Sequence, residues 1–356
     1  MTWLAIWQAG AGAVRPAGTS IPARLFRGTL LAEIDLARLG GQGDPLLHLA
    51  ASGTGFTLGL QADGRVYGRV SDSGQSGFAA CRVGAEAPQG TLRLSWQWDG
   101  FNRMSRLTAE HLDAGTLRQS ETEGVAPPGR EMIAALFVGR AAFRHPGLQW
   151  MALADQVTPV AVPPGLAPET RIATPLGPRP VSALQPGDLV TTADAGPQPV
   201  VWSGGLCLPA QGSDRPVRLL APFFGQAGDL VLHPRHRVLL GGPEVEYLFD
   251  RDEVLVEARH LVDGRTALQV AEDTLVRYHG VVLEQPHLLI AEGARIESQF
   301  LGRIGTDPAL ASTTLCRDLA ARRSLPIHRA VRRQLGALEA AMLVQARARR
   351  CAPLAA

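Results

Sequence analysis

Two histidines, His233 and His236, stand three positions apart in the segment His-Pro-Arg-His. Histidine exchanges a proton near neutral pH and also binds metal ions, so this pair is the first candidate for chemistry. A zinc site needs at least a third ligand, and the spacing of the other histidines selects none. Two structural histidines are therefore favoured over a zinc site. The histidines considered as distant ligands are His260, His279 and His287.

The cysteines do not offer a second centre for chemistry. The chain has 4 cysteines, and no two of them form a Cys-x-x-Cys pair. A disulfide framework and a cysteine-type zinc site are therefore both unexpected. We accordingly expect no metal and no cofactor. The cysteines are Cys81, Cys207, Cys316 and Cys351.

Length and composition indicate a mainly β protein with two domains. A chain of 356 residues can form two domains, each with its own hydrophobic core. Hydrophobic residues make up 46% and charged residues 19%, which is typical of a globular chain. The 39 glycines and 26 prolines favour short strands joined by tight turns. A Pro-rich break, Val160-Ala-Val-Pro-Pro164, separates two regions of different character.

Before that break, short apolar runs alternate with turn residues, which predicts an antiparallel β-sandwich. Asp63-Gly64 lies between two of these runs and favours a hairpin, because glycine accepts a positive φ. The order of the runs resembles a concanavalin-like or laminin-G-like jelly roll. Trp96, Trp98 and Trp150 could floor a sugar site, but alternating tryptophans in a sheet are more often core residues. The predicted strands are 1–7, 30–36, 56–60, 65–70, 91–98, 105–109, 133–138 and 147–152.

After the break, the sequence predicts further short strands and then a helix. From Pro326, apolar residues recur at three- and four-residue steps, which indicates an amphipathic helix. Ser324 and Pro326 mark its predicted start. The apolar stripe consists of Ile327, Val331, Leu335, Leu338 and Met342. The predicted strands are 171–174, 188–192, 198–202, 217–220, 229–232 and 237–240.

Several blocks of this second region occur in a fixed order. The first is Thr170-Arg-Ile-Ala-Thr-Pro175, the second is the Pro186-Gly-Asp188 turn, and the third is Asp229–Leu240, which holds both histidines. The later blocks are Glu253–Gly264 and Ala291–Ser298. Together they resemble a bacterial Hint (hedgehog/intein) autoprocessing domain. That resemblance implies an all-β Hint fold in a chain built to cut or splice its own backbone.

In that family, a cysteine at the start of the domain attacks the preceding carbonyl and converts an amide into a thioester. The resemblance puts the nucleophile position at Gly165, which has no side chain to attack with. It assigns to His236 the protonation of the leaving nitrogen. The family Asp of a late block becomes Glu284 and the family His becomes Pro286, while His233 replaces a small hydroxyl residue. We therefore predict a domain that is degenerate for autoprocessing, with His236 either a vestigial catalytic residue or a hydrogen-bonded core histidine.

These observations predict a mainly β fold class, with an N-terminal antiparallel, jelly-roll-like β-sandwich followed by an all-β Hint fold and a C-terminal amphipathic helix. A net charge of +2 gives no reason to expect nucleic acid as a partner. No apolar run approaches the roughly 18 residues of a membrane span, and no basic leader precedes the apolar start. We expect cytoplasmic residence or export by a signal-independent route. The predicted parts are the β-sandwich 1–158, a linker 159–164, the Hint domain 165–302 and a helical extension 303–356.

Two other functions stay open at this stage. The chain could be a secreted or surface binding protein whose β-sandwich recognises a glycan or a protein partner. It could also be a metal-dependent hydrolase that uses His233 and His236. Under the leading hypothesis, any enzymatic activity is limited to self-cleavage. If the scaffold and His236 are still competent, Gly165→Cys should make the chain sensitive to thiols.

Overall fold

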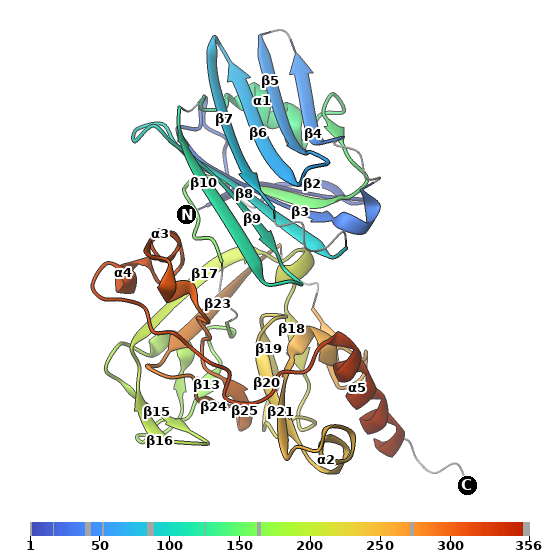
Figure 1. Cartoon of the computed structure of the whole chain (residues 1–356), viewed down its shortest axis with the longest axis vertical. Helices are drawn as coiled ribbons and strands as arrows, with labels where there is room; N and C mark the ends of the chain where they lie inside the picture. Colours follow the sequence, from blue (N-terminus) through green and yellow to red (C-terminus); the bar gives the residue numbers. More distant parts are fainter. Residues whose placement is uncertain are drawn as a thin grey trace. The chain divides into compact units, whose positions relative to one another are not determined.

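The computed structural model describes residues 2–16, 18–39, 44–51, 53–83, 89–124, 126–161, 165–270 and 274–351, without the side chains of residues 44 and 349–351. The chain forms two compact units, Met1–Ala161 and Val162–Ala356 (Figure 1). Residues 162–164 of the predicted linker and residues 352–356 of the predicted extension lie outside the described residues. Both units are mainly β, which confirms the predicted fold class.

The first unit is an antiparallel β-sandwich. Its strands are β1 (Trp3–Gln8), β2 (Gly12–Val14), β3 (Arg27–Asp35), β4 (Asp44–Ala51), β5 (Thr54–Leu60), β6 (Arg65–Asp72), β7 (Gln75–Arg82), β8 (Thr91–Asp99), β9 (Met104–His111), β10 (Thr116–Glu123), β11 (Phe143–Arg144) and β12 (Leu148–Ala154), with a 3-10 turn η1 (Leu36–Arg38). Within the described residues, one sheet has the order β10-β9-β8-β3-β12-β1-β2 and the other the order β11-β4-β5-β6-β7. The predicted hairpin joins β5 to β6, and Gly64 in its turn has a φ of 78°.

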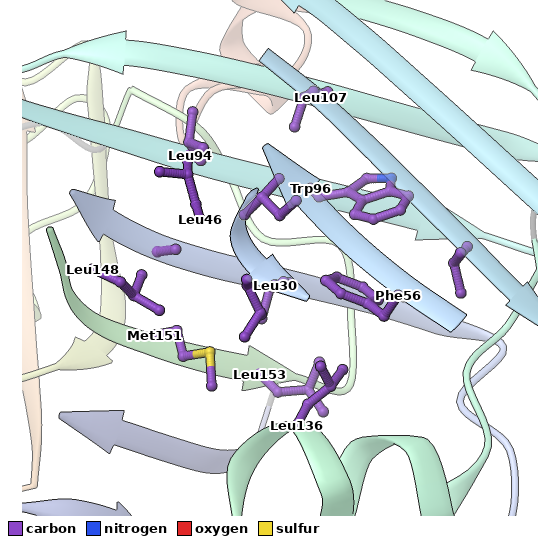
Figure 2. Close-up of a cluster of buried hydrophobic side chains, with 14 of the residues drawn as sticks. Leu30, Leu46, Phe56, Leu94, Trp96, Leu107, Leu136, Leu148, Met151 and Leu153 are labelled. Carbon is purple, nitrogen blue, oxygen red and sulfur yellow. The ribbon is translucent and has the colours of Figure 1, made fainter. Parts of the chain in front are cut away.

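The two sheets enclose a hydrophobic core because each strand directs alternate residues inward. On β8 the inward residues include Leu94, Trp96 and Trp98, all of which are buried. Figure 2 shows Phe56 of the opposite sheet beside Trp96, with ring centroids 5.3 Å apart. Trp96, Trp98 and Trp150 are 3%, 6% and 1% exposed. They are therefore buried sheet residues and do not form the floor of an open sugar site.

The strand predicted over residues 133–138 is wrong, because residues 133–137 belong to the helix α1 (Arg130–Phe137) and Val138 follows its end. An apolar run this short fits either a buried strand or a buried helix face. Glu131 lies in the first turn of α1, where an acidic side chain interacts favourably with the helix dipole. Leu136 of this helix and Leu153 of β12 lie in the same buried cluster (Figure 2). The buried residues of α1 follow helical spacing: Met132, Ile133, Leu136 and Phe137.

The second unit consists mainly of short antiparallel strands. These are β13 (Arg171–Ile172), β14 (Arg179–Pro180), β15 (Leu189–Thr192), β16 (Gly196–Pro199), β17 (Trp202–Pro209), β18 (Val217–Leu219), β19 (Leu230–Leu232), β20 (Arg237–Gly241), β21 (Glu253–Glu257), β22 (Ala267–Gln269), β23 (Leu275–Val282), β24 (Leu288–Ala291) and β25 (Ala294–Glu297). Its helical elements are η2 (Val181–Ala183), η3 (Gly212–Asp214), α2 (Pro243–Phe249), η4 (Ala258–Leu261), η5 (Ile304–Thr306), α3 (Pro308–Ala311), α4 (Arg317–Ala320) and α5 (Ala337–Cys351). The strand predicted over 198–202 is divided between β16 and β17.

The strands of the second unit form one larger sheet and two small ones among the described residues. The larger sheet has the order β14-β13-β24-β25-β20-β21, with β15 and β16 attached at β24. The small sheets are β17-β23 and β19-β18-β22. Their apolar side chains meet in a core that contains Leu166, Ile172, Leu232 and Val281, so the residue after Gly165 is part of this core.

The C-terminal helix begins later than predicted, at Ala337 and not at Pro326. The preceding residues run beside β21, where Leu255 N–H donates to Arg333 C=O at 2.8 Å and Leu335 N–H donates to Leu255 C=O at 2.9 Å. Backbone groups that pair with a strand cannot also close helical turns. The predicted helix start was wrong because the apolar spacing does not reveal this pairing.

The buried face of α5 also differs from the predicted stripe. Leu338 and Met342 are 84% and 54% exposed, whereas Ala340 and Leu343 are fully buried. The stripe assumes one continuous helix from Pro326, but α5 starts anew after residue 336 and so has a different phase. No helix that the structure describes has the length and apolar character needed to cross a membrane.

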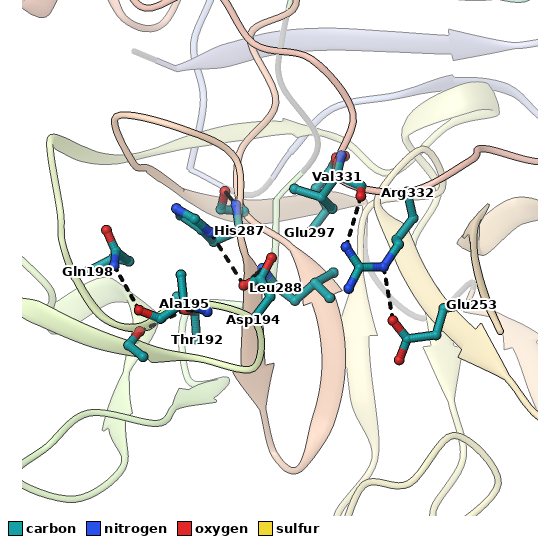
Figure 3. Close-up of polar contacts among 12 residues, drawn as sticks. Thr192, Asp194, Ala195, Gln198, Glu253, His287, Leu288, Glu297, Val331 and Arg332 are labelled. Carbon is teal, nitrogen blue, oxygen red and sulfur yellow. Dashed lines mark hydrogen bonds and ion pairs between the residues drawn. The ribbon is translucent and has the colours of Figure 1, made fainter.

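Polar contacts hold the extended segment before α5 to the second unit (Figure 3). Arg332 Nε donates to Glu253 Oε2 at 3.0 Å, and Val331 N–H donates to Glu297 Oε1 at 3.5 Å. The Val331 side chain packs against a small apolar cluster that includes Leu255 and Leu288. The C-terminal extension is therefore an integral part of this unit's fold.

Candidate functional site

Residues 165–167 form an extended segment between β19 and β23. Leu166 N–H donates to His279 C=O at 2.9 Å, and His279 N–H donates back to Leu166 C=O at 2.8 Å. On the other side, His233 N–H donates to Gly165 C=O at 2.8 Å. Gly165 itself is buried. The position that the sequence assigns to the nucleophile is thus a buried backbone position.

No side chain fits at Gly165 without movement of the backbone. A Cβ there would lie 2.9 Å from the His279 carbonyl oxygen, 3.0 Å from Tyr278 Cβ and 3.1 Å from the His279 amide nitrogen. Two of these atoms belong to the main chain of β23, which cannot rotate aside as a flexible side chain can. The space that a nucleophile would need is therefore filled by β23.

His233 is part of a buried hydrogen-bond network. Its Nε2 lies 3.0 Å from Asp214 Oδ1, and both residues have an exposed fraction of 0%. Its Nδ1 accepts a hydrogen bond from Arg235 N–H at 3.1 Å, so the ring proton lies on Nε2 and is donated to Asp214. With one nitrogen accepting from the backbone and the other bonded to Asp214, the His233 ring connects β19 to η3.

Tyr278 of β23 completes this network. Its hydroxyl donates to the Asp214 carbonyl oxygen at 2.7 Å, and its ring meets the His233 ring edge-on with centroids 5.0 Å apart. Burial, followed by the charge of Asp214, raises the pKa of Tyr278 above its usual range, so the hydroxyl remains a donor. Neither Tyr278 nor Asp214 was identified from the sequence.

Backbone hydrogen bonds link His236 to His233 and His233 to Gly165. Its N–H donates to the His233 carbonyl oxygen at 2.8 Å, and its own carbonyl oxygen accepts from Ala258 N–H at 2.9 Å. The side chain is 4% exposed. The structure therefore joins Gly165, His233 and His236 in one hydrogen-bonded segment. The catalytic role of His236 stays a prediction.

Glu284 lies apart from this segment, beyond the end of β23. Its side chain is 58% exposed, and its two carboxylate oxygens accept from Arg323 Nη2 at 2.9 and 2.7 Å. The guanidinium thus comes from the C-terminal extension. The role of Glu284 in place of the family Asp also stays a prediction, and the surface ion pair is the contact that the structure gives it.

His279, considered from the sequence only as a distant metal ligand, pairs with a serine. Its Nε2 lies 3.0 Å from Ser203 Oγ, and the two residues are 76 positions apart. Burial and then the charge of Arg277 lower the pKa of His279, so its ring is neutral near pH 7. The His279 ring lies against Gly205. A Cβ at Gly205 would be only 2.7 Å from His279 Nδ1, so a side chain there would displace the ring. No sequence motif signals this pair, because it forms only through the pairing of β17 with β23.

The Ser203–His279 pair has the residue types of a nucleophile and its base, but it does not restore the missing nucleophile. β23 lies between β17 and the strand that holds Leu166. Neighbouring strands are about 4.8 Å apart, so two such steps separate the backbone of Ser203 from the start of the domain. Ser203 therefore lies on a strand that does not pair with the segment that holds Gly165.

The remaining candidates for chemistry are metal ligands and thiols. Among the residues that the structure describes, no group of three or more His, Cys, Asp or Glu side chains could hold a metal ion. Burial raises the pKa of Cys81 to about 11 and that of Cys316 to about 12. Burial also raises the pKa of the half-buried Cys207. These thiols are protonated near neutral pH and are poor nucleophiles.

The second unit is therefore a compact, mainly β domain in which two strands enclose the segment that holds Gly165. Residues 164–303 match the family described as the Hint domain. This match confirms the central part of the sequence-based resemblance, so the protein contains a Hint domain.

Comparison with solved structures gives matches that each cover part of the chain. The gp41-1 intein is 14% identical, covers 37% of this chain and 97% of its own, and has a TM-score of 0.25. The MchDnaB-1 intein is 19% identical, covers 37% of this chain and 98% of its own, and has a TM-score of 0.27. A carbohydrate-binding module, CBM40, of the Ruminococcus gnavus IT-sialidase bound to alpha2,6 sialyllactose is 15% identical, covers 37% of this chain and 78% of its own, and has a TM-score of 0.25. A comparison with curated proteins gave no match. The Hint assignment rests on the family match.

Proposed function

We propose that this protein carries a Hint domain that no longer cuts its own chain and that serves as a rigid module. The observation that carries this proposal is the closed position at Gly165, where β23 occupies the space for a nucleophile. Acyl transfer requires a nucleophilic side chain next to the carbonyl that it attacks. His233, which replaces a small hydroxyl residue, is committed to Asp214. The scaffold is thus retained while the groups for chemistry are missing or engaged elsewhere.

The purified full-length protein should keep its mass of 37.9 kDa during prolonged incubation, with or without added thiol. The physical reason is that neither Gly165 nor its neighbours Leu166 and Ala167 supply a nucleophile. Intact-mass spectrometry over several days tests this expectation. Spontaneous appearance of a fragment that ends near residue 164 would contradict it. His236→Ala then separates the causes, because a Hint reaction should stop in this variant and cleavage by a contaminating protease should not.

A second candidate function is recognition of a glycan or a protein partner by the first unit, which we propose to be of the concanavalin-like or laminin-G-like kind. Phe26 and Phe101 favour it, since they are 47% and 69% exposed and their ring centroids lie 5.6 Å apart. The Arg27 guanidinium lies 5.0 Å from the Phe101 ring centroid and donates to Asp99 at 2.9 Å. Exposed aromatic rings flanked by polar groups provide stacking surfaces for sugars and for partner side chains.

A glycan array and a pull-down with the full-length protein test this second function. Phe101→Ala should weaken binding of any ligand found there by at least about tenfold, because an aromatic anchor dominates such contacts. Phe78→Ala is the matched control, since Phe78 is 51% exposed in the same unit but lies on β7. No binding by the wild type, or equal losses in both variants, would remove the support for a site at Phe26 and Phe101.

A further inference from the structure

The second unit contains a cavity of about 410 Å³ that shares no lining residue with the Gly165 segment. This volume is within the roughly 300–1,000 Å³ that is typical of small-molecule sites. Its walls are the turn with Phe223 and Phe224, residues 240–244 where β20 leads into α2, the turn from Asp263 to Thr266, and one side of α5. The cavity therefore lies where four separate segments meet.

The C-terminal extension is needed to form this cavity. Val344, Arg347 and Ala348 of α5 line it, and α5 lies beyond residue 303, where the family match ends. α5 packs beside α2, as Figure 1 also shows. The Hint-type part of the chain thus supplies three walls and the extension supplies the fourth. The cavity is a property of this chain that the family match does not imply.

The interior of the cavity is mainly apolar. Leu240 and Leu261 are buried in the core of the unit, and Phe224 and Val344 pack against the same core. Phe223 is 52% exposed, so the cavity is open to solvent on that side. An apolar pocket of this size favours a ligand with a hydrocarbon or aromatic body.

Two guanidinium groups lie at the polar side of the cavity. Arg347 Nη2 donates to Gly241 C=O at 2.7 Å, which fixes its position on the wall. Arg265 is exposed, and its side chain forms no hydrogen bond or ion pair within the residues that the structure describes. Of the two lining carboxylates, Asp263 is occupied by the backbone N–H groups of its own turn, and Glu244 lies at the start of α2. A guanidinium binds a carboxylate through paired, charge-assisted hydrogen bonds.

We propose that this cavity binds a small amphiphilic carboxylate of the medium-chain fatty acid class. Its apolar body would lie against Leu240, Leu261 and Val344. Its carboxylate would bind the exposed guanidinium of Arg265. The site is independent of autoprocessing, so its test does not depend on whether the Hint domain is active.

Isothermal titration calorimetry of the full-length protein with decanoate, below the concentration at which decanoate forms micelles, tests the proposal. We expect one-to-one binding, with affinity rising by up to about fourfold for each methylene added from octanoate to decanoate. Decyltrimethylammonium has the same tail with a positive head and should bind at least about tenfold more weakly. Absence of decanoate binding, or equal binding of the cation, would overturn the proposal.

Substitutions locate the binding at this cavity. Arg265→Gln should weaken decanoate binding by about tenfold, and Ala348→Trp should block it by filling the cavity with an indole ring. Arg322→Gln and Ala341→Trp are matched controls, because both residues are exposed and lie outside the cavity lining. Wild-type binding in both cavity variants places decanoate elsewhere and rejects the site. If Ala348→Trp does not fold, as judged by circular dichroism, Arg265→Gln decides the question.

Discussion

Gly165→Cys should leave the chain uncut in the presence of thiol and should destabilise the protein by about 1–3 kcal/mol, the usual cost of overpacking a well-packed site. The new Cβ would lie 2.9 Å from the carbonyl oxygen of His279, and its sulfur would extend further into β23. The strand must then shift, which strains the backbone pairing between Leu166 and His279. Denaturant unfolding and intact-mass spectrometry measure the two effects.

Gly228→Cys is the matched control for this experiment. A Cβ at Gly228 meets no atom within 4 Å, so stability should change by no more than about 0.5 kcal/mol. For Gly165→Cys, cleavage of the chain would be the result that contradicts the expectation. A thiol-dependent fragment that ends near residue 164, and that disappears when His236→Ala is added, would show that β23 can move aside. The domain would then lack only its nucleophile.

The sequence predicted most of the strands because their signals are local. On β8, apolar residues alternate with polar ones over Thr91–Asp99, and the turn at Gly64 requires a positive φ. The Hint blocks could also be found from the sequence, because each combines turn residues with a short apolar strand. The closed position at Gly165 could not be predicted, since it depends on how closely β23 approaches a residue more than a hundred positions earlier.

The two errors in the helices have a common physical cause. In α1 a short apolar run fits either a strand or a helix, and before α5 apolar residues at three- and four-residue steps fit a helix that does not form there. Tertiary contacts then decide the structure: residues 130–137 pack as a helix on the sandwich core, and Leu335 pairs with Leu255 of β21. Local spacing does not contain this information.

The candidate site was only partly visible in the sequence for the same reason. Its histidines were identified from the His-x-x-His spacing, but their partners come from distant segments. Asp214 lies in the turn η3 and reads as an ordinary loop residue, although it bonds to His233, which is 19 positions away. Tyr278 bonds to Asp214 across 64 positions. Such contacts follow from strand pairing and have no local signature.

Asp214→Ala should destabilise the protein by about 1–3 kcal/mol, the cost of leaving a buried hydrogen-bond donor without its acceptor. The change leaves the Nε2–H of His233 in a buried site without the carboxylate that accepts from it. The hydrogen bond from Tyr278 goes to the backbone carbonyl oxygen of Asp214 and is not removed by the substitution. The free energy of unfolding, measured in urea, should therefore report the loss of the His233 contact.

Glu284→Ala is the matched control, because Glu284 also pairs with a basic group but at the surface. Its ion pair with Arg323 has side chains that are 45% and 58% exposed, so its loss should cost less than about 1 kcal/mol. Equal effects of Asp214→Ala and Glu284→Ala would contradict a stabilising role of the buried network. If Asp214→Ala does not fold, Asp214→Asn and His233→Ala can be compared singly and together. A double variant that costs less than the sum of the single variants would show that the two side chains stabilise the domain through one shared interaction.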